Sequence, residues 1–421
     1  MTAIPRLVRE TAAPPAAQLT RSALANDLRT RIFPAPAAAR SVPSIGAEVE
    51  IILVDVGTRR PLRLDGPRST LALLRHAGAS AGWCERRSAK AGVPEMNLPD
   101  GGRITFEPGG QIEISSAPNA SLSDLVRQLR ETVDRISAAA SPDIELLACG
   151  VDPLTPVDEV APQLHAERYR RMLRHFDRIG PSGARMMRQT ASFQVCIDGG
   201  EVPERTWTVL NALAPHVVAM FANSARYEGR ATGHKSFRRH IWATLDPRRT
   251  GLLGVSGDPI EEYLRFALDA PAFLLPDVAG EAAPFSYWLT RGATSADWCA
   301  HLSTLFPEVR PRGYFELRSC DAVAPEWYAV PLVLVAGIAY HRPSLDAAAE
   351  LLGCPDPALL GRAGQLGLAD PTLRAVAPAL CELALAGCRA LGTAFVEDDD
   401  LDAAGAFFDR YTRRGLSPAD D

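Results

Sequence analysis

The segment "RITFEPGGQIEIS", residues 103–115, joins two strand-like runs through a Pro-Gly-Gly break, and the expected sheet is built around it. Two carboxylates, Glu107 and Glu113, stand on either side of this break. A strand that only packs against a core has little use for two acids and a forced bend. Bulges and glycine kinks beside active sites re-aim the backbone. We therefore expect Pro108-Gly109-Gly110 to let both acids reach one concave face.

Three further strand-like segments present polar side chains at every second residue, the period of a β-strand. Side chains two residues apart on a strand lie about 6.5–7 Å from each other on the same face. The polar positions are Glu48 and Glu50 in "IGAEVEIILVDV" (45–56), Thr190, Ser192 and Gln194 in "RMMRQTASFQVCIDG" (185–199), and Glu316 and Arg318 in "RGYFELRSCD" (312–321). Four strands with polar faces indicate a lined site more than a solvated surface.

The order of the segments predicts an α+β fold, with a curved, mostly antiparallel sheet forming a funnel and helices packed outside it. The clearest helix covers residues 121–140, where Ser121 and Asp124 make a capping-box pattern. Residues 1–40 are rich in Ala, Pro and Arg, which predicts an arm or linker that is partly helical or disordered. Residues 41–421 are expected to form a single catalytic domain. Rossmann and Walker glycine motifs are absent from the sequence.

Composition excludes several classes of protein. A net charge of −5 argues against a nucleic-acid binder, which usually carries a basic excess. No apolar run approaches the ~20 residues of a membrane span, and no export signal opens the sequence. The eight cysteines are scattered without metal-ligand spacing, which is typical of reduced thiols in the cytoplasm. We expect a cytoplasmic protein without membrane or nucleic-acid partners.

A cluster of carboxylates on one sheet face predicts a metal site, because like charges side by side need cations to hold them together. Oxygen ligands without Cys or His favour Mg²⁺ or Mn²⁺, and Mg²⁺ completes its octahedron with water and phosphate oxygens. Arg318, two residues after Glu316, is placed to neutralise charge on a transferring phosphoryl group. In the basic segment 226–250, Arg238 is our preferred candidate for binding a substrate carboxylate.

Seven motifs together resemble the glutamate–cysteine ligases of the plant and proteobacterial type, including the actinobacterial branch that feeds ergothioneine synthesis. They are "GAEVE", "FEPGGQIEIS", "MMRQTASFQVCID", "FANSARYEG", "GHKSFRRHIWATLDPRRTGLL", "GYFELRSCD" and the ending "RYTRRGLSPADD". The resemblance runs from about residue 44 to the C-terminus and implies a glutamine synthetase-like fold in a monomer or homodimer. It also implies that ATP phosphorylates the γ-carboxylate of L-glutamate and that L-cysteine then attacks the acyl phosphate.

The resemblance further implies roles for individual residues. Metal-binding positions would be Glu48, Glu50, Glu107, Glu113, Glu316 and Gln194; catalytic positions Arg318 and Glu316; substrate-binding positions Arg238, Arg188 and Thr190; and ATP-binding positions Lys235 and Arg318. One departure stands out, because the plant-like pattern has an arginine directly before the threonine of the "T-x-x-x-Q-V" strand. Here Gln189 occupies that place and Arg188 lies one residue earlier, and a one-residue shift on a strand turns a side chain to the other face.

Three alternatives to a glutamate–cysteine ligase remain. The protein could be an ATP-dependent ligase for another acid and amine, or a guanidino-kinase of related fold, against which "EPGGQIE" speaks. It could also be an inactive relative that binds nucleotide, although Glu48, Glu50, Glu107, Glu113, Glu316 and Arg318 are all present. Whether the product feeds glutathione or ergothioneine synthesis is left open by the sequence.

Overall fold

The computed structural model describes residues 19–37, 42–87, 92–254 and 257–421. The first eighteen residues of the predicted arm and residues 38–41 of the predicted linker lie outside the described residues. In the described part, nine strands form one sheet in the order β12-β13-β7-β1-β5-β4-β3-β2, with β6 added to β1. All neighbours in this sheet run antiparallel, which confirms the predicted α+β class.

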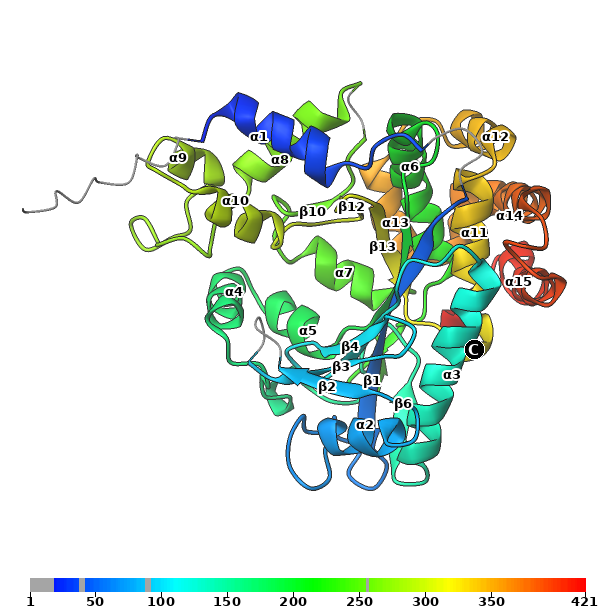
Figure 1. Ribbon diagram of the computed structural model, residues 1–421, viewed down its shortest axis with the longest axis horizontal. Helices are drawn as coiled ribbons and strands as arrows, with labels where there is room; N and C mark the ends of the chain where they lie inside the picture. Colours follow the sequence, from blue (N-terminus) through cyan, green and yellow to red (C-terminus); the bar gives the residue numbers. More distant parts are fainter. Residues whose placement is uncertain (1–18, 38–41, 88–91, 255–256) are drawn as a thin grey trace, which may run out of the picture.

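The nine strands of the main sheet are β1 (Ile45–Asp55), β2 (Cys84–Arg87), β3 (Pro94–Asn97), β4 (Arg103–Phe106), β5 (Ile112–Ser115), β6 (Ile144–Leu147), β7 (Ser192–Ile197), β12 (Val309–Pro311) and β13 (Phe315–Asp321). Two small sheets pair β8 (Arg226–Tyr227) with β9 (Arg230–Ala231) and β10 (Thr250–Gly251) with β11 (Phe306–Pro307). The long strand β1 lies at the centre of the main sheet, where it pairs with β5, β6 and β7 (Figure 1).

The α-helices are α1 (Arg21–Asp27), α2 (Thr70–Gly78), α3 (Leu122–Ala140), α4 (Glu167–Asp177), α5 (Ser182–Gln189), α6 (Pro203–Met220), α7 (Phe237–Ala243), α8 (Pro259–Asp269), α9 (Phe285–Leu289), α10 (Ser295–Leu302), α11 (Ala329–Ala339), α12 (Arg342–Leu352), α13 (Pro357–Leu366), α14 (Pro371–Leu391) and α15 (Asp398–Arg410). A π-helical turn, η1 (Leu28–Ile32), extends α1; short 3₁₀ turns occur at η2 (Val157–Glu159), η3 (Pro325–Trp327), η4 (Gly367–Ala369), η5 (Thr412–Arg414) and η6 (Pro418–Asp420). None of the described helices is both long enough and apolar enough to span a bilayer.

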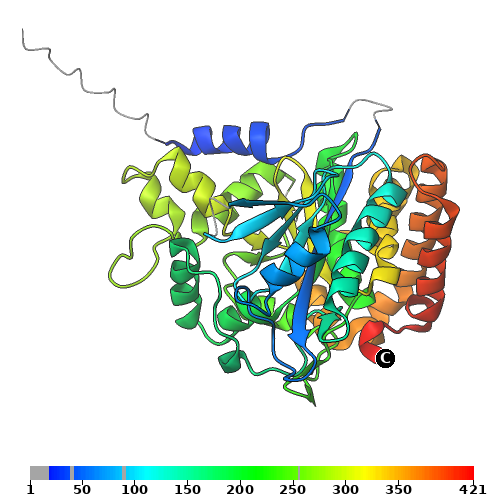
Figure 2. The same ribbon diagram turned by 60° about the horizontal axis from the view of Figure 1, so that its bottom comes forward.

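The helices form two groups around the sheet. One group, with α3, α6, α11, α14 and α15, forms a thick layer on one side, and the other, with α4, α5, α7 and α10, lies on the opposite side (Figures 1 and 2). Helix α11 is buried along its whole length and contacts α14 closely. A Cβ at Gly337 would lie 2.0 Å from the carbonyl oxygen of Ala384, so only glycine allows this approach. The thick layer leaves the other sheet face for a site.

The helix expected over 121–140 is confirmed as α3, with Ser121 as its N-cap. The Ser121 hydroxyl accepts a hydrogen bond from the backbone N–H of Asp124 at 3.2 Å, which satisfies one unpaired donor of the first turn. The Asp124 carboxylate binds Arg127. The apolar stripe of α3 is buried, and it includes Leu125 and Leu129.

One strand prediction was wrong in its extent. Residues 185–199 were expected to be extended throughout, but Ser182–Gln189 form helix α5 and the strand begins at Ser192. The helical spacing of Ala184 and Met187, which are both buried, explains the difference, because a helix places residues three apart on one face. Arg188 and Gln189 therefore belong to the last turn of a helix.

The described part of the N-terminal arm packs onto the body. Leu24 and Leu28 are buried, and the indole N–H of Trp298 donates to the carboxylate of Asp27 at 2.9 Å. Phe33 packs edge-on against Trp207 in the core. Helix α1 accordingly lies across α8 and α10 in both views (Figures 1 and 2). The division into residues 1–40 and 41–421 stays a prediction.

Candidate active site

A cavity of about 590 Å³ opens on the sheet face that the thick helical layer leaves free. Strands β1, β5, β7 and β13 supply its floor, and α4, α5, α7 and α10 supply its walls. Eight of the predicted site residues line it: Glu48, Glu50, Glu107, Glu113, Thr190, Gln194, Arg238 and Arg318. Alternation along four antiparallel strands therefore brings acids and arginines from distant parts of the sequence into one cavity.

Three of the carboxylates lie close enough together to bind one ion. Glu50, Glu107 and Glu113 each offer an oxygen, and these oxygens all lie within 4.8 Å of one another. Glu50 and Glu113 are direct partners in the β1–β5 register, which places them side by side on one sheet face. Glu107 arrives from the end of β4. No ion pair joins any of these three acids to Lys or Arg within the described residues.

The Pro-Gly-Gly break is a hairpin turn between β4 and β5, so the chain reverses there instead of kinking within one strand. The N–H of Gly110, whose φ is +93°, donates to the Glu107 carbonyl at 2.8 Å. A Cβ at Gly109 would lie 2.2 Å from the carbonyl oxygen of Arg188, so a larger residue would displace the turn. The reversal is what brings Glu107 and Glu113 to the same site.

Gln163 holds this turn from behind. Its Nε2 donates to the carbonyl of Gly109 at 2.7 Å and to that of Leu62 at 3.2 Å, while its Oε1 accepts the N–H of Leu64. Its backbone N–H donates to the carbonyl of Pro108 at 2.6 Å. One side chain thus ties the turn that carries Glu107 to the loop after β1.

Burial and mutual repulsion disfavour the ionised form of these acids. Burial raises the pKa of Glu107 well above its ordinary value, and the charges of Glu113 and Glu50 raise it further. Burial, with the charges of Glu113 and Glu316, raises the pKa of Glu48 to about 8. Burial also raises the pKa of Glu50, although Ser192 N–H donates to its carboxylate at 2.7 Å. Such a cluster gains from a cation.

Glu316 lies in a different environment, against three arginines. Arg310 donates to its carboxylate at 2.9 Å and Arg312 at 3.1 Å, and Arg318 donates to it as well. Burial alone would raise the pKa of Glu316, but the arginine charges outweigh it and lower the pKa to about 2. Glu316 is fully buried and does not line the cavity. The structure therefore places it outside the carboxylate cluster, with its oxygens occupied by guanidinium groups.

Arg318 and Gln194 connect the acids to the arginines. Arg318 Nη1 donates to Gln194 Oε1 at 2.7 Å, and Gln194 Nε2 donates to Glu50 at 3.2 Å. Arg238 lies beside them and donates from Nη2 to the backbone carbonyl of Arg318 at 2.8 Å. We call the three clustered acids the acid end of the cavity, and Arg238 with Arg318 the arginine end; Gln194 connects the two.

Besides Glu316, two predicted site residues are not brought to the cavity. Arg188 lies in the last turn of α5, where its Nη1 donates to the Val160 carbonyl at 2.6 Å and its Nε to that of Ala184 at 3.3 Å. Lys235 pairs with Asp420 near the C-terminus. Neither lines the cavity, and substrate binding by Arg188 and ATP binding by Lys235 stay predictions.

Sequence reasoning missed Arg310 and Arg312, which line the cavity and hold Glu316. The signal was available, since the two arginines stand two residues apart just before the β13 strand, and an antiparallel turn places Arg310 opposite Glu316. Arg31, from the N-terminal arm, also reaches the cavity wall. Nothing in the local sequence pointed to it.

Comparison with known proteins agrees with this geometry. The model of the family "Glutamate-cysteine ligase family 2(GCS2)" matches residues 44–364. The glutamate–cysteine ligase EgtA of Mycolicibacterium smegmatis is 34% identical over 359 residues, covering 80% of this chain and 81% of the relative. The chloroplastic glutamate–cysteine ligase of Arabidopsis thaliana is 29% identical over 416 residues, covering 89% and 75%.

A solved structure supports the fold. The glutamate–cysteine ligase of Francisella tularensis in complex with AMP superposes with a TM-score of 0.51, covering 92% of this chain and 84% of that one at 13% identity. The family model alone accounts for more than half of the chain. The antiparallel sheet, the acid-lined cavity and the matched span lead to one conclusion: this chain belongs to glutamate–cysteine ligase family 2.

Proposed function

We propose that the protein is an ATP-dependent ligase that joins the γ-carboxylate of L-glutamate to the amine of L-cysteine through a γ-glutamyl phosphate. The observation that carries the proposal is one cavity with three clustered carboxylates, Glu50, Glu107 and Glu113, facing Arg238 and Arg318. Membership of the family and the relatives' names support the reaction type.

The acid end of the cavity fits a hard divalent cation. Its donors are carboxylate oxygens with raised pKa values at Glu50 and Glu107, and the described residues supply no ion-pair partner for the three acids. Mg²⁺ and Mn²⁺ prefer such ligands. Glu50, Glu107 and Glu113 would hold the ion, with Glu48 and Gln194 beside them. A metal there would reduce the repulsion between the carboxylate and the triphosphate.

The arginine end of the cavity fits the negative charges of the substrates. Arg318 is fixed by Glu316 and Gln194, so its guanidinium is already oriented toward the acids and can stabilise charge on a phosphoryl group in transfer. Arg238 is buried and contributes a planar fork that suits the α-carboxylate of glutamate. Thr190 lines the same wall.

The order of events follows from the chemistry of the acid. A carboxylate is a poor electrophile, so phosphorylation must first supply a leaving group. The amine of cysteine then attacks the acyl carbon and phosphate departs with the bonding electrons. Water must be excluded during this interval, because hydroxide would compete for the same carbon.

A substrate panel tests the proposal. The purified protein is incubated with Mg²⁺ and ATP, and each of several acids is combined with each of several amines, with ADP measured and products identified by mass spectrometry. We expect ADP formation to need glutamate and cysteine together, with a γ-linked product. Turnover with a different acid or amine, and none with this pair, would replace the proposal by the alternative of another carboxylate–amine ligase.

A further inference from the structure

Arg238 is held on one side and open on the other. Its side chain is only 5% exposed, and its Nη2 donates to the carbonyl of Arg318. Its Nε is buried and has no hydrogen-bond partner within the described residues. The nearest ion-pair partner of its guanidinium is Asp321, with Nη1 and Oδ1 3.6 Å apart. The arginine is thus fixed by contacts that leave a donor unused.

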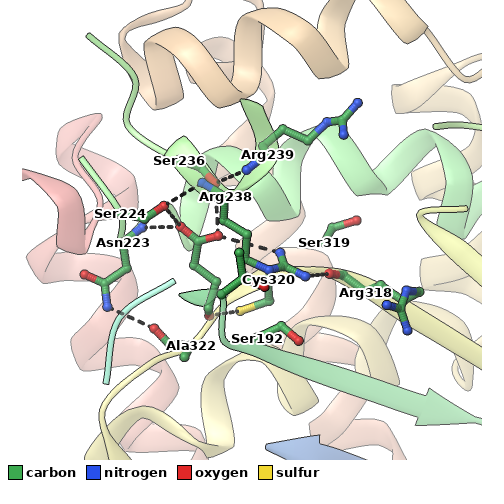
Figure 3. A network of polar contacts seen from close by, with 12 residues as sticks. Ser192, Asn223, Ser224, Ser236, Arg238, Arg239, Arg318, Ser319, Cys320 and Ala322 are labelled. Atoms are coloured by element: carbon green, nitrogen blue, oxygen red, sulfur yellow. Dashed lines mark hydrogen bonds and ion pairs between the residues drawn. The ribbon is translucent and has the colours of Figure 1, made fainter. Parts of the chain in front are cut away.

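Asp321 is the centre of a buried polar network at the end of β13, and Figure 3 labels its partners Asn223, Ser224 and Ser236. Its side chain is 1% exposed. Its Oδ2 accepts the N–H of Asn223 at 2.9 Å and the hydroxyl of Ser224 at 2.7 Å, and its Oδ1 accepts the hydroxyl of Ser236 at 2.9 Å. None of these groups lines the cavity.

The two serines connect Asp321 to the backbone of α7. The hydroxyl of Ser224 accepts the backbone N–H of Arg238, and the hydroxyl of Ser236 accepts that of Arg239, both at 3.1 Å. Asp321 therefore orients Arg238 twice, through the backbone of the first turn of α7 and through the guanidinium itself. Both routes lead to the Asp321 carboxylate.

Gly150 closes one side of the space around the Asp321 carboxylate. A Cβ at Gly150 would lie 2.5 Å from the Asp321 Cγ. The Gly150 N–H donates to the carbonyl of Asn223 at 2.9 Å, so the loop that closes this space belongs to the same network. A carboxylate confined in this way acts as a rigid counter-charge.

The reason for such a counter-charge lies in the cavity. Burial raises the pKa of Glu50, one of the three clustered acids, and the nearby charge of Arg238 lowers it. A buried guanidinium without a compensating carboxylate would be drawn toward that cluster, where it would displace a cation. A fixed acid behind the arginine keeps the guanidinium facing the cavity.

We propose that Asp321 is the positioning residue for Arg238, holding its guanidinium where it can bind the carboxylate of the acid substrate and away from Glu50. Asp321 itself touches no substrate. The inference rests on the proposed function, in which Arg238 binds the α-carboxylate of glutamate. Asp321, which lies behind the cavity, then affects the affinity for the acid substrate and not the affinity for ATP.

The test uses Asp321→Asn, which keeps the shape of the side chain and removes its charge. L-Glutamate binding is measured by calorimetry with Mg²⁺ and a non-hydrolysable ATP analogue, and the KM values for glutamate and ATP are measured in parallel. We expect glutamate binding to weaken by about 10–100-fold, the loss that follows when a charged hydrogen-bonding group is misplaced. The KM for ATP should change by less than about 3-fold, since the nucleotide does not depend on Arg238.

A double-mutant cycle separates positioning from general support of the fold. If Asp321 acts through Arg238, the pair Asp321→Asn with Arg238→Lys should bind glutamate within about 3-fold of Arg238→Lys alone. Additive losses, or equal losses for glutamate and ATP, would overturn the inference. The matched control is Asp370→Asn, another buried aspartate paired with an arginine, Arg362, at the start of α14 and outside the cavity lining. It should lower stability without changing either constant.

Two further outcomes are distinguishable. If the unchanged protein binds no glutamate, the proposed acid substrate is wrong and this inference fails with it. If the unchanged protein binds glutamate, and Arg238→Lys weakens the binding while Asp321→Asn does not, only the positioning role is overturned. Should Asp321→Asn fail to fold, Ser224→Ala removes one of its donors, and we expect a weakening in the same direction of about 3–10-fold.

Discussion

The two ends of the cavity are built in opposite ways. At one end Glu50, Glu107 and Glu113 face one another without an ion-pair partner in the described residues, and the pKa values of Glu50 and Glu107 are raised. Behind the other end Glu316, which does not line the cavity, is surrounded by arginines, which lower its pKa to about 2. Glutamates of the same protein therefore differ in pKa because of the charges beside them.

The difference separates a part that a ligand completes from a part that is already complete. The clustered acids repel one another and gain from a cation, so folding leaves them under electrostatic strain. Arg318 is held by Glu316 and Gln194, and Arg238 pairs with Asp321, so both guanidinium groups keep their orientation before any substrate arrives. Oriented guanidinium groups beside a carboxylate cluster that gains from a cation suit the transfer of a phosphoryl group between anions.

The largest expected effect concerns the complete end. Glu316→Gln leaves the largely buried guanidinium groups of Arg310 and Arg318 beside a neutral group, and breaking a buried charge pair in this way costs about 3–5 kcal/mol. We expect the free energy of unfolding, measured by denaturant titration without metal, to fall by that amount. A change below about 1 kcal/mol would show that the arginines do not depend on Glu316.

The next effect concerns the incomplete end. Glu107→Gln removes a carboxylate whose ionised form the folded protein disfavours. The metal-free protein should therefore be as stable as before or more stable. The rate of ligation should fall by more than about 100-fold, because this loss exceeds that caused by removing a residue that only orients a metal ligand. Thermal melts and ADP release measure the two. The control Glu85→Gln, an exposed acid on β2, should leave ligation unchanged; equal losses would contradict the assignment.

The same contrast predicts a pH dependence. Glu48 has a folded pKa of about 8 against an ordinary value of 4.5, so the folded protein binds more protons than the unfolded chain between these values. The stability of the metal-free protein should therefore fall as pH rises from about 4.5 toward 8. Mg²⁺ should reduce this fall, because the ion replaces the protons. Melting temperatures measured across pH with and without Mg²⁺ test this; parallel curves would contradict it.

The smallest effect concerns the support of the turn. Gln163→Leu removes the hydrogen bonds to Gly109 and Leu62 and should raise the Mg²⁺ concentration for half-maximal activity by about 10-fold. The KM for glutamate should stay unchanged, because Arg238 lies at the other end. Gln128→Leu, on α3, is the control. A shift in both constants would mean that the turn supports the whole cavity and not the acid end alone.

Local patterns in the sequence were sufficient for one end of the cavity. Strand periodicity placed Glu48 and Glu50 on one face. The Pro-Gly-Gly break indicated that Glu107 and Glu113 reach a common face. Both inferences succeed because a strand alternates its side chains whatever lies around it. The hairpin itself was missed, since a strand-like run looks the same whether the chain bends or reverses.

The other end depended on contacts between distant segments. The sequence predicted ligand contacts for Arg188 and Lys235. In the structure, Arg188 donates to the carbonyl of Val160 and Lys235 pairs with Asp420. The role of Glu316 as a metal ligand stays a prediction, and the register of β12 against β13 places Arg310 opposite it. The amino-acid sequence thus specified which acids share a sheet face, because that is local geometry. Which acids stay free for a cation was set by the tertiary fold, because charge compensation depends on neighbours that strand register and helix packing bring together.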